Sequence, residues 1–200
     1  MQILLIRHGQ SEADLLKVHE GRADFQLTEL GIQQAHLMAD WVKNTFKPEI
    51  IWSSPLIRAM KTAEILSEKV DCKIKYDSDL MEWNNGVLAG MSRAEAIKKY
   101  PEPVKGHRPH ESVEKGESAI AFRMRGELAI SKIMSESNEY NRIAVISHGG
   151  SISRMIQSFM KLPVINDYII RTDDTGIHLL EYKDEKQVIH FLNRTNHLNL

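Results

Sequence analysis

The sequence MQILLIRHGQSE, residues 1–12, decides the fold class of this chain. Its apolar run at 3–6 is short and uninterrupted, which is typical of a strand that is buried on both faces. Arg7, His8 and Gly9 follow directly, at the place where open α/β sheets bind their ligands. Taken alone, the stretch also fits a strand that ends in a solvated Arg-His pair, so its meaning depends on what the chain places beside it.

The composition indicates a globular chain with no strong overall charge. The chain has 200 residues, with 26 Lys and Arg against 27 Asp and Glu and a net charge of −1. This length suits one domain over 1–200, with a core that needs no covalent staples. Because the net charge is near zero, we expect neither nucleic acid nor an anionic membrane as a partner, and any anion site must be a local cluster.

Cysteine content and the N-terminal sequence bear on the cell compartment. Cys72 is the only cysteine, which excludes an intramolecular disulfide and a cysteine-rich zinc site. The first expected strand begins at the initiating methionine and no apolar run approaches membrane-spanning length, so we expect a cytoplasmic protein without a signal peptide. The closing residues 194–200 are not strongly apolar, which leaves both a monomer and a homodimer open.

Short apolar runs predict further strands. The runs at 49–53 and 142–147 are similar to the first one and predict two more buried strands. A weaker pattern at 73–76 predicts an edge strand. Near the end, β-like runs at 176–182 and 188–193 flank the polar turn KDEKQ, which predicts a hairpin.

Apolar residues at helical spacing predict a helix after most of these strands. The expected helices begin near Thr28, Ser54, Ser92, Ser118 and Gly149. Hydroxyl side chains at four of these starts suit helix N-caps, with Pro55 at the first position of the second helix. The polar segment 13–26 is predicted to be a loop. For the helix over 118–137, the expected buried stripe is Ile120, Met124, Leu128 and Ile133.

Polar side chains follow three of the expected strands at the point where each strand ends. They form three groups, Arg7-His8-Gly9, Ser53-Ser54-Pro55 with Arg58, and His148-Gly149-Gly150. If the strands are parallel neighbours, the three groups meet in one crevice. Arg58 falls in a first helical turn, where a cation opposes the helix dipole, so an anionic partner explains it best.

Two arginines, two histidines and backbone donors suit a phosphoryl group. Guanidinium forks match phosphate oxygens, and a Gly-rich turn at a helix N-terminus presents free N–H groups to an anion. A neutral histidine can attack phosphorus and carry the phosphoryl group, whereas a protonated one can donate to its oxygens. These residues do not by themselves decide whether His8 or His148 attacks.

Glu82 is a candidate proton donor. It lies between Met81 and Trp83, and a carboxyl group in apolar surroundings can stay protonated near neutral pH. Without further context, an ordinary loop glutamate explains this residue better.

The segment 101–117 is the clearest compositional break in the chain. It contains three prolines, two glycines and many charged residues, which predicts an excursion over the surface, a lid or simply a solvated loop. His107 and His110 are separated by Pro109, which argues against one helical face and hence against a metal-binding pair.

Six short motifs together make the sequence recognisable. They are RHGQS at 7–11, D-x-x-LTELG at 24–31, SSPLIRAMKTAE at 53–64, L-x-E at 80–82, GES at 116–118 and SHGG at 147–150. The chain thereby resembles the histidine phosphatase superfamily, the phosphoglycerate-mutase-like proteins, nearly from end to end. This resemblance implies an α/β fold, a three-layer α/β/α sandwich around a mostly parallel sheet.

The resemblance also implies a metal-independent active site for a small phosphomonoester, with no cofactor. In it, His8 is the nucleophile that becomes phosphohistidine, while Arg7, Arg58 and His148 hold the phosphoryl group. Glu82 is the general acid that protonates the leaving oxygen and then the base for the attacking water. Further substrate-binding residues are expected at Ser11, Asp14, Glu20, Gly21 and Gly149.

Two acidic residues depart from the family pattern. Asp14 stands where the family usually has an asparagine that contacts the phosphoryl group, and Glu20 stands before Gly21 where Gln-Gly is common. A carboxylate at either position repels phosphate unless it is protonated or turned away. Alternatively, the two acids bind a hydroxyl or amine group of the substrate.

Three functions remain compatible with these residues: a phosphatase, a phosphoglycerate-mutase-type isomerase and a non-catalytic module that binds a phosphorylated ligand. Family mutases carry a longer insertion after the general acid and tend to have arginine directly after it, where this chain has Trp83. We therefore expect a phosphatase. All core catalytic positions are filled, which weighs against a binding module, although Asp14 keeps that alternative open.

Overall fold

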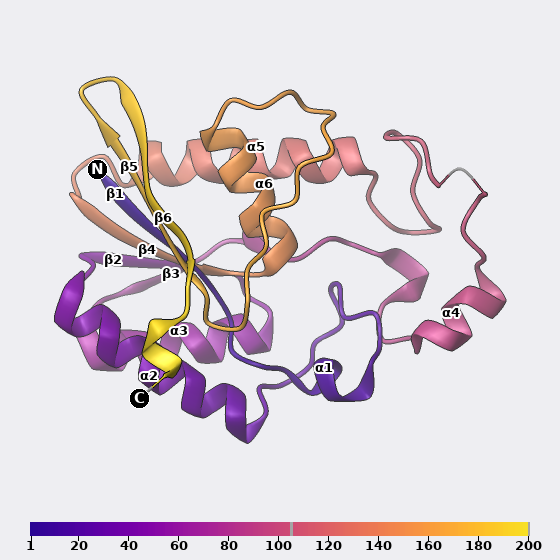
Figure 1. Ribbon diagram of the computed structural model, residues 1–200, viewed down its shortest axis with the longest axis horizontal. Helices are drawn as coiled ribbons and strands as arrows, with labels where there is room; N and C mark the ends of the chain where they lie inside the picture. Colours follow the sequence, from indigo (N-terminus) through magenta and orange to yellow (C-terminus); the bar gives the residue numbers. More distant parts are fainter. Residues whose placement is uncertain (105, 200) are drawn as a thin grey trace.

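A six-stranded sheet forms the centre of the protein (Figure 1). The computed structural model describes residues 1–104 and 106–199. The strands are β1 Gln2–Arg7, β2 Ile50–Ser53, β3 Ile74–Tyr76, β4 Arg142–Ser147, β5 Ile177–Lys183 and β6 Lys186–Arg194. In the order β3-β2-β4-β1-β5-β6, neighbours from β3 to β1 are parallel, whereas β5 is antiparallel to both β1 and β6. The predicted strands and the C-terminal hairpin are confirmed.

Helices cover both faces of this sheet. They are α1 Glu12–Leu16, α2 Glu29–Thr45, α3 Ile57–Val70, α4 Arg93–Lys99, α5 Ala119–Glu136 and α6 Gly149–Phe159. In Figure 1, α2 and α3 lie on one side of the sheet, and α5 and α6 lie on the other. The expected three-layer α/β/α arrangement is therefore confirmed. Among the described helices, none is both long and apolar enough to cross a membrane.

Burial on both faces explains why β1 has no polar residue between Ile3 and Ile6. Leu4 and Ile6 pack into the apolar cluster beneath α2 and α3, whereas Ile3 and Leu5 pack into the cluster beneath α5 and α6. All four side chains are fully buried. Successive side chains of a strand point to opposite faces, so a central strand between two helical layers must be apolar at every position.

Two expectations about the chain up to the start of α3 are wrong. The segment predicted as a loop contains the short helix α1, and α3 begins at Ile57 instead of at Ser54. The physical reason is that Asp24, from a distant loop, accepts the Ile57 N–H at 2.7 Å and so supplies the helix cap. The Ser54 hydroxyl instead contacts His148 Nε2 at 2.8 Å.

The expected buried stripe of α5 is also largely wrong. Ile133 is buried, but Met124 and Leu128 are 43% and 60% exposed. The helix approaches α6 through Gly126, where a Cβ atom would lie only 2.7 Å from the Cβ of Arg154. A close helix contact through a small residue therefore sets the buried face of α5, which the hydrophobic periodicity does not report.

A pair of glycines lets α2 pack directly against the segment that follows β1. A Cβ on Gly31 would overlap the carbonyl oxygen of Gln10, and a Cβ on Gly9 would overlap the carbonyl oxygen of Gly31. Thr28 caps the same helix end by accepting the Gly31 N–H at 3.0 Å, as predicted. The RHG and LTELG motifs therefore meet in one backbone contact beside His8.

We expect Gly31→Ala to reduce the free energy of unfolding by roughly 1–3 kcal/mol, because the added methyl group must displace neighbouring backbone. Helix propensity alone predicts an increase in the free energy of unfolding, because alanine favours the helix more than glycine does. Thermal unfolding measures the difference, with Gln33→Ala at an exposed position of α2 as the control, expected within about 0.5 kcal/mol of wild type. A Gly31→Ala protein as stable as wild type would contradict this packing argument.

The parallel part of the sheet fixes where polar groups gather. The C-terminal ends of β1, β4 and β2 lie next to one another, and α1 and α4 lie beyond them (Figure 1). The described residues of 101–117 form no helix or strand and lie on the same side. This agrees with the predicted surface excursion, whereas its function as a lid stays a prediction.

Candidate active site

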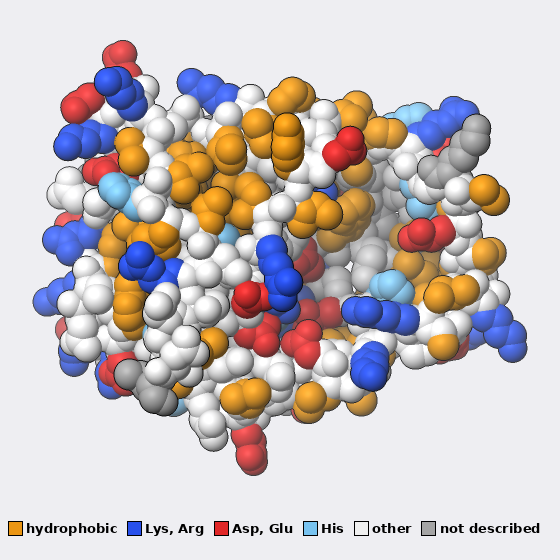
Figure 2. All heavy atoms as spheres, viewed as in Figure 1, with side chains coloured by type: hydrophobic (Ala, Val, Ile, Leu, Met, Phe, Trp, Pro, Cys, Tyr) orange, Lys and Arg blue, Asp and Glu red, His pale blue; other side chains and the backbone are white. Residues whose placement is uncertain are grey.

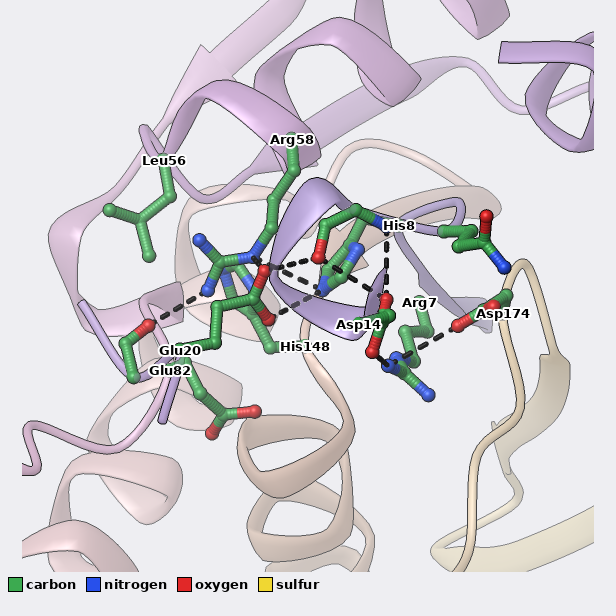
Figure 3. Close-up of polar contacts among 12 residues, drawn as sticks. Arg7, His8, Asp14, Glu20, Leu56, Arg58, Glu82, His148 and Asp174 are labelled. Atoms are coloured by element: carbon green, nitrogen blue, oxygen red, sulfur yellow. Dashed lines mark hydrogen bonds and ion pairs between the residues drawn. The ribbon is translucent and has the colours of Figure 1, made fainter. Parts of the chain in front are cut away.

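Four side chains from three strand ends converge at this edge (Figure 3). Arg7 is the last residue of β1, His8 follows it, Arg58 lies in the first turn of α3, and His148 joins β4 to α6. His8 and His148 have ring centroids 5.0 Å apart, and His8, Arg58 and His148 are at most 1% exposed. The structure thus brings together the three groups that the sequence placed at the ends of separate strands.

His8 is held neutral, with the lone pair of Nε2 directed at Arg58. Its Nδ1 lies 2.7 Å from the Gly9 carbonyl oxygen, which can only accept, so Nδ1 carries the proton. Its Nε2 faces Arg58, whose Nε donates to it at 3.3 Å. Burial, together with the charges of Arg58 and Arg7, holds the pKa of His8 well below its ordinary value. A nucleophilic nitrogen therefore faces a guanidinium group.

His148 is placed as a neutral donor. The Ser54 hydroxyl accepts the Leu56 N–H at 3.3 Å and lies 2.8 Å from His148 Nε2, and we assign the hydroxyl as the donor in this second contact. This assignment leaves the imidazole proton on Nδ1, which is buried and has no hydrogen-bond partner among the described residues. Burial and the charge of Arg58 keep the pKa of His148 well below its ordinary value. An unused buried donor beside His8 suits a ligand oxygen.

Arg58 is fixed by the loop that precedes α2. Its Nη2 donates to the Gly21 carbonyl at 2.8 Å and its Nη1 to the Ala23 carbonyl at 3.0 Å. Gly21 has a φ of 49°, and a Cβ there would overlap the Asn85 side chain. Glycine is thus required at this turn, and the turn aims the Arg58 guanidinium at His8.

Arg7 is held by a segment that the sequence analysis did not single out. Its Nη1 donates to the Thr172 carbonyl at 3.0 Å, and its Nη2 lies 3.2 Å from an Asp174 carboxylate oxygen. Both residues directly precede β5, which runs antiparallel to β1 and so begins where β1 ends. The polar run RTDDTG before the predicted hairpin was the available signal, but the position of the hairpin beside β1 was not inferred.

Glu82 lies at the N-terminus of α6. Its Oε2 accepts the Gly150 N–H at 2.9 Å, and its Oε1 accepts the Trp83 N–H at 2.8 Å. Two backbone N–H groups thus hold the carboxylate, and the surroundings are more polar than the flanking Met81 and Trp83 suggest. The carboxylate is therefore preorganised, and a carboxyl group in such a position can both give and accept a proton.

The backbone around Glu82 is held by the partly buried guanidinium of Arg125. Arg125 donates to the carbonyl oxygens of Asp79, Met81 and Glu82 at 2.8, 2.6 and 3.1 Å. It also pairs with Glu117, the acid of the GES motif, at 2.5 Å. Neither residue was a site candidate from sequence. Together they fix the backbone from which the Glu82 side chain projects.

Asp14 and Glu20 both lie among the arginines. Asp14 accepts the Ser11 N–H at 3.0 Å, and its other oxygen lies 3.9 Å from Arg7 Nη2. Glu20 lies 3.2 Å from Arg58 Nε and accepts the Ser11 hydroxyl at 2.5 Å. Burial raises the pKa of Glu20. Neither carboxylate is turned away from the cations, and both compete with an anionic ligand.

The site opens onto a cavity of about 650 Å³ lined by Asp14, Glu20, His19 and Asn85, among others. Figure 2 shows acidic side chains gathered near the middle of this face, next to a hollow. Gly149 lies at the N-terminus of α6, where an added Cβ would lie 3.8 Å from Arg7. The open helix end, two arginines and a buried imidazole donor together suit a tetrahedral anion.

Comparisons with known proteins agree with this geometry. A family model described as "Histidine phosphatase superfamily (branch 1)" matches residues 3–195. The chain is 32% identical over 206 residues to a protein of Hydrogenobacter thermophilus named "Putative phosphoserine phosphatase 2", covering 98% of this chain and 97% of the relative. It is 28% identical to "Probable phosphoglycerate mutase GpmB" of Proteus mirabilis, covering 92% of this chain and 86% of that protein.

A solved structure shows the same architecture. The α-ribazole phosphatase of Shigella flexneri superposes with a TM-score of 0.88 at 23% identity, covering 98% of this chain and 97% of that one. At this identity the likeness concerns the arrangement of strands and helices.

Proposed function

Since the chain belongs to the histidine phosphatase superfamily (branch 1), we propose that it hydrolyses small phosphomonoesters through a phosphohistidine intermediate on His8. The observation that carries the proposal is the arrangement of His8. Its Nε2 lone pair faces Arg58 in a buried site that also holds Arg7 and the free Nδ1–H of His148. We take His8 as the nucleophile because the Gly9 carbonyl fixes its proton on Nδ1 and so leaves a lone pair on Nε2, whereas the contacts of His148 fix no tautomer.

In the first step, His8 Nε2 attacks phosphorus and the bond from phosphorus to the leaving oxygen breaks. Arg7, Arg58 and His148 donate to the three non-bridging oxygens, whose charge they stabilise in a site with little water. Glu82, when protonated, gives its proton to the leaving oxygen, so the product leaves as an alcohol. The Gly9 carbonyl retains the Nδ1–H of the phosphorylated imidazole and supports its positive charge.

In the second step, Glu82 takes a proton from water while the water oxygen attacks phosphorus. The bond between phosphorus and Nε2 breaks, phosphate leaves, and His8 returns to the neutral tautomer. Glu82 regains its proton in the same step, so it acts once as acid and once as base. The fixed guanidinium groups supply the positive charge that phosphoryl transfer needs, so no metal is part of the proposed mechanism.

Two features support hydrolysis over isomerisation. Trp83 follows Glu82, and its indole N–H donates to the Glu117 carbonyl at 2.9 Å, so an apolar ring stands where family mutases tend to carry arginine. The excursion at 101–117 is also shorter than the insertion that family mutases carry after the general acid. A mutase must exclude water and return the phosphoryl group to its substrate.

We expect EDTA-treated protein to release phosphate from p-nitrophenyl phosphate at an unchanged rate compared with untreated protein. The same preparation should release phosphate from 3-phosphoglycerate without forming 2-phosphoglycerate, or leave it intact. Formation of 2-phosphoglycerate would identify a mutase. Loss of all activity on chelation would overturn the metal-independent mechanism, and tight phosphate binding without any turnover would identify a binding module.

A further inference from the structure

Glu20 lies where the proposed mechanism needs the phosphoryl group. Its carboxylate is 3.2 Å from Arg58 Nε and 3.9 Å from His8 Nε2. A phosphorus atom poised for attack lies about 3–3.5 Å from the nucleophile, with its oxygens on the same guanidinium. The carboxylate and a phosphoryl group therefore cannot share this position, and substrate binding must displace Glu20 from Arg58.

Displacement leaves Glu20 without a cation. Its side chain is only 18% exposed, and the other charged groups that face it are Arg7 and Asp14. Arg7 is already paired with Asp174 and is the second ligand of the phosphoryl group. Once phosphate occupies both arginines, the charged groups nearest to the half-buried Glu20 carboxylate are the phosphate and Asp14, and Lys17 and Arg93 on the same cavity wall are exposed, so the carboxylate is poorly compensated.

The Ser11 hydroxyl cannot relieve this excess of negative charge. It lies 2.5 Å from Glu20 Oε1 and 3.2 Å from Asp14 Oδ2, but a hydroxyl has one proton and can donate to only one of them. Two carboxylates therefore share one donor beside the phosphoryl position. The missing partner is a group with several N–H donors and a positive charge.

Asn85 lies on the wall of the same cavity, but its side-chain oxygen packs against Gly21. The side-chain oxygen of Asn85 is buried and has no hydrogen-bond partner among the described residues. Asn85 lines the cavity together with Asp14 and Glu20, and the exposed Lys17 and Arg93 are the other charged groups on its wall. The acceptors that this wall offers to a ligand are therefore the carboxylates of Asp14 and Glu20, with the exposed Lys17 and Arg93 beside them.

We propose that Glu20 makes the site selective for phosphomonoesters whose alcohol portion carries an ammonium group. The inference rests on the proposed function and assigns its substrate class. When the phosphoryl group takes Arg58, the substrate's own ammonium group replaces Arg58 as the cation beside Glu20, with Asp14 as a second acceptor. A phosphomonoester with an uncharged alcohol portion brings no cation to Glu20. Its phosphoryl group must therefore displace Glu20 from Arg58 without supplying a new partner for the carboxylate.

The test compares O-phosphoethanolamine with n-propyl phosphate, in which a methyl group replaces the ammonium group. At pH 7.5 we expect wild type to prefer the amine ester by about tenfold to a hundredfold in kcat/KM, as for a charge-assisted hydrogen bond. Glu20→Gln should bring this ratio near one, because it should raise kcat/KM for n-propyl phosphate and lower kcat/KM for O-phosphoethanolamine. Glu12→Gln, which removes an exposed carboxylate on α1, should keep the wild-type ratio.

Binding to His8→Ala protein separates this inference from the proposed function, because neither ester is consumed there. The ratio of the two Kd values should show the same preference and the same dependence on Glu20. An equal Kd for both esters, or a ratio that Glu20→Gln does not change, would overturn the selectivity even if His8-dependent hydrolysis is found. Equal binding that tightens as pH falls, and only when Glu20 is present, would show that a proton neutralises Glu20 instead and would also overturn it.

Discussion

His8→Ala is expected to lower kcat for p-nitrophenyl phosphate by at least about four orders of magnitude, because no other group can form the covalent intermediate. His148 is not expected to substitute, since we assign it as a donor to the phosphoryl group, with Nε2 on Ser54 and the proton on Nδ1. Phosphate release measured at saturating substrate checks this prediction.

The controls for His8→Ala concern folding and charge. His36→Ala changes an exposed histidine on α2 and should keep wild-type turnover. Thermal unfolding should show that His8→Ala stays folded, since the side chain makes only two hydrogen bonds among the described residues, with the adjacent Gly9 carbonyl and with Arg58 Nε. A folded His8→Ala protein with more than a hundredth of wild-type turnover would rule out His8 as the nucleophile.

Glu82→Gln is expected to lower kcat/KM for alkyl phosphates by about 10²–10⁴-fold, the usual contribution of a general acid. An alkoxide is a poor leaving group and needs the proton, whereas p-nitrophenolate leaves readily without one. The loss on p-nitrophenyl phosphate should therefore be less than about tenfold in the step that expels the alcohol. A single-turnover assay with both esters isolates this step.

Glu114→Gln is the matched control for Glu82→Gln, because Glu114 is an exposed glutamate in the nearby excursion. It should leave both esters unaffected. Equal losses on the two esters in Glu82→Gln would show that the carboxylate only organises the N-terminus of α6, through the Gly150 N–H, and would remove it as the proton donor.

The sequence predicts the central sheet well because burial on both faces leaves a simple pattern. The apolar runs at 3–6, 49–53 and 142–147 have few alternatives to a central strand, and each lies within one residue of its predicted bounds. The chemistry-bearing groups at their C-terminal ends follow from the parallel order alone. This is why Arg7, Arg58 and His148 meet around His8 without any knowledge of the loops.

Features set by contacts between distant segments are not predictable from periodicity. The start of α3 depends on Asp24, which reaches it from the loop before α2. The buried face of α5 depends on the close approach of Gly126 to Arg154. In both cases a single tertiary contact overrides the local pattern of caps and apolar residues.

The acidic groups of the site are predictable only in part. The sequence marks Asp14 and Glu20 as departures from the family pattern, but the contact of Glu20 with Arg58 depends on the turn at Gly21. Asp174 precedes β5 and meets Arg7 only because that strand pairs with β1. Residue types therefore indicate repulsion of phosphate, whereas the geometry shows which cation each carboxylate occupies.

The most direct test of the account is to trap the covalent intermediate. A phosphomonoester labelled in its phosphoryl group is mixed with the protein, quenched in alkali within the first turnover, and the labelled peptide is identified. The account predicts an alkali-stable, acid-labile label on His8, formed in the presence of EDTA and absent from His8→Ala. A label on another residue, or full turnover with no label on His8 at any quench time, would contradict it.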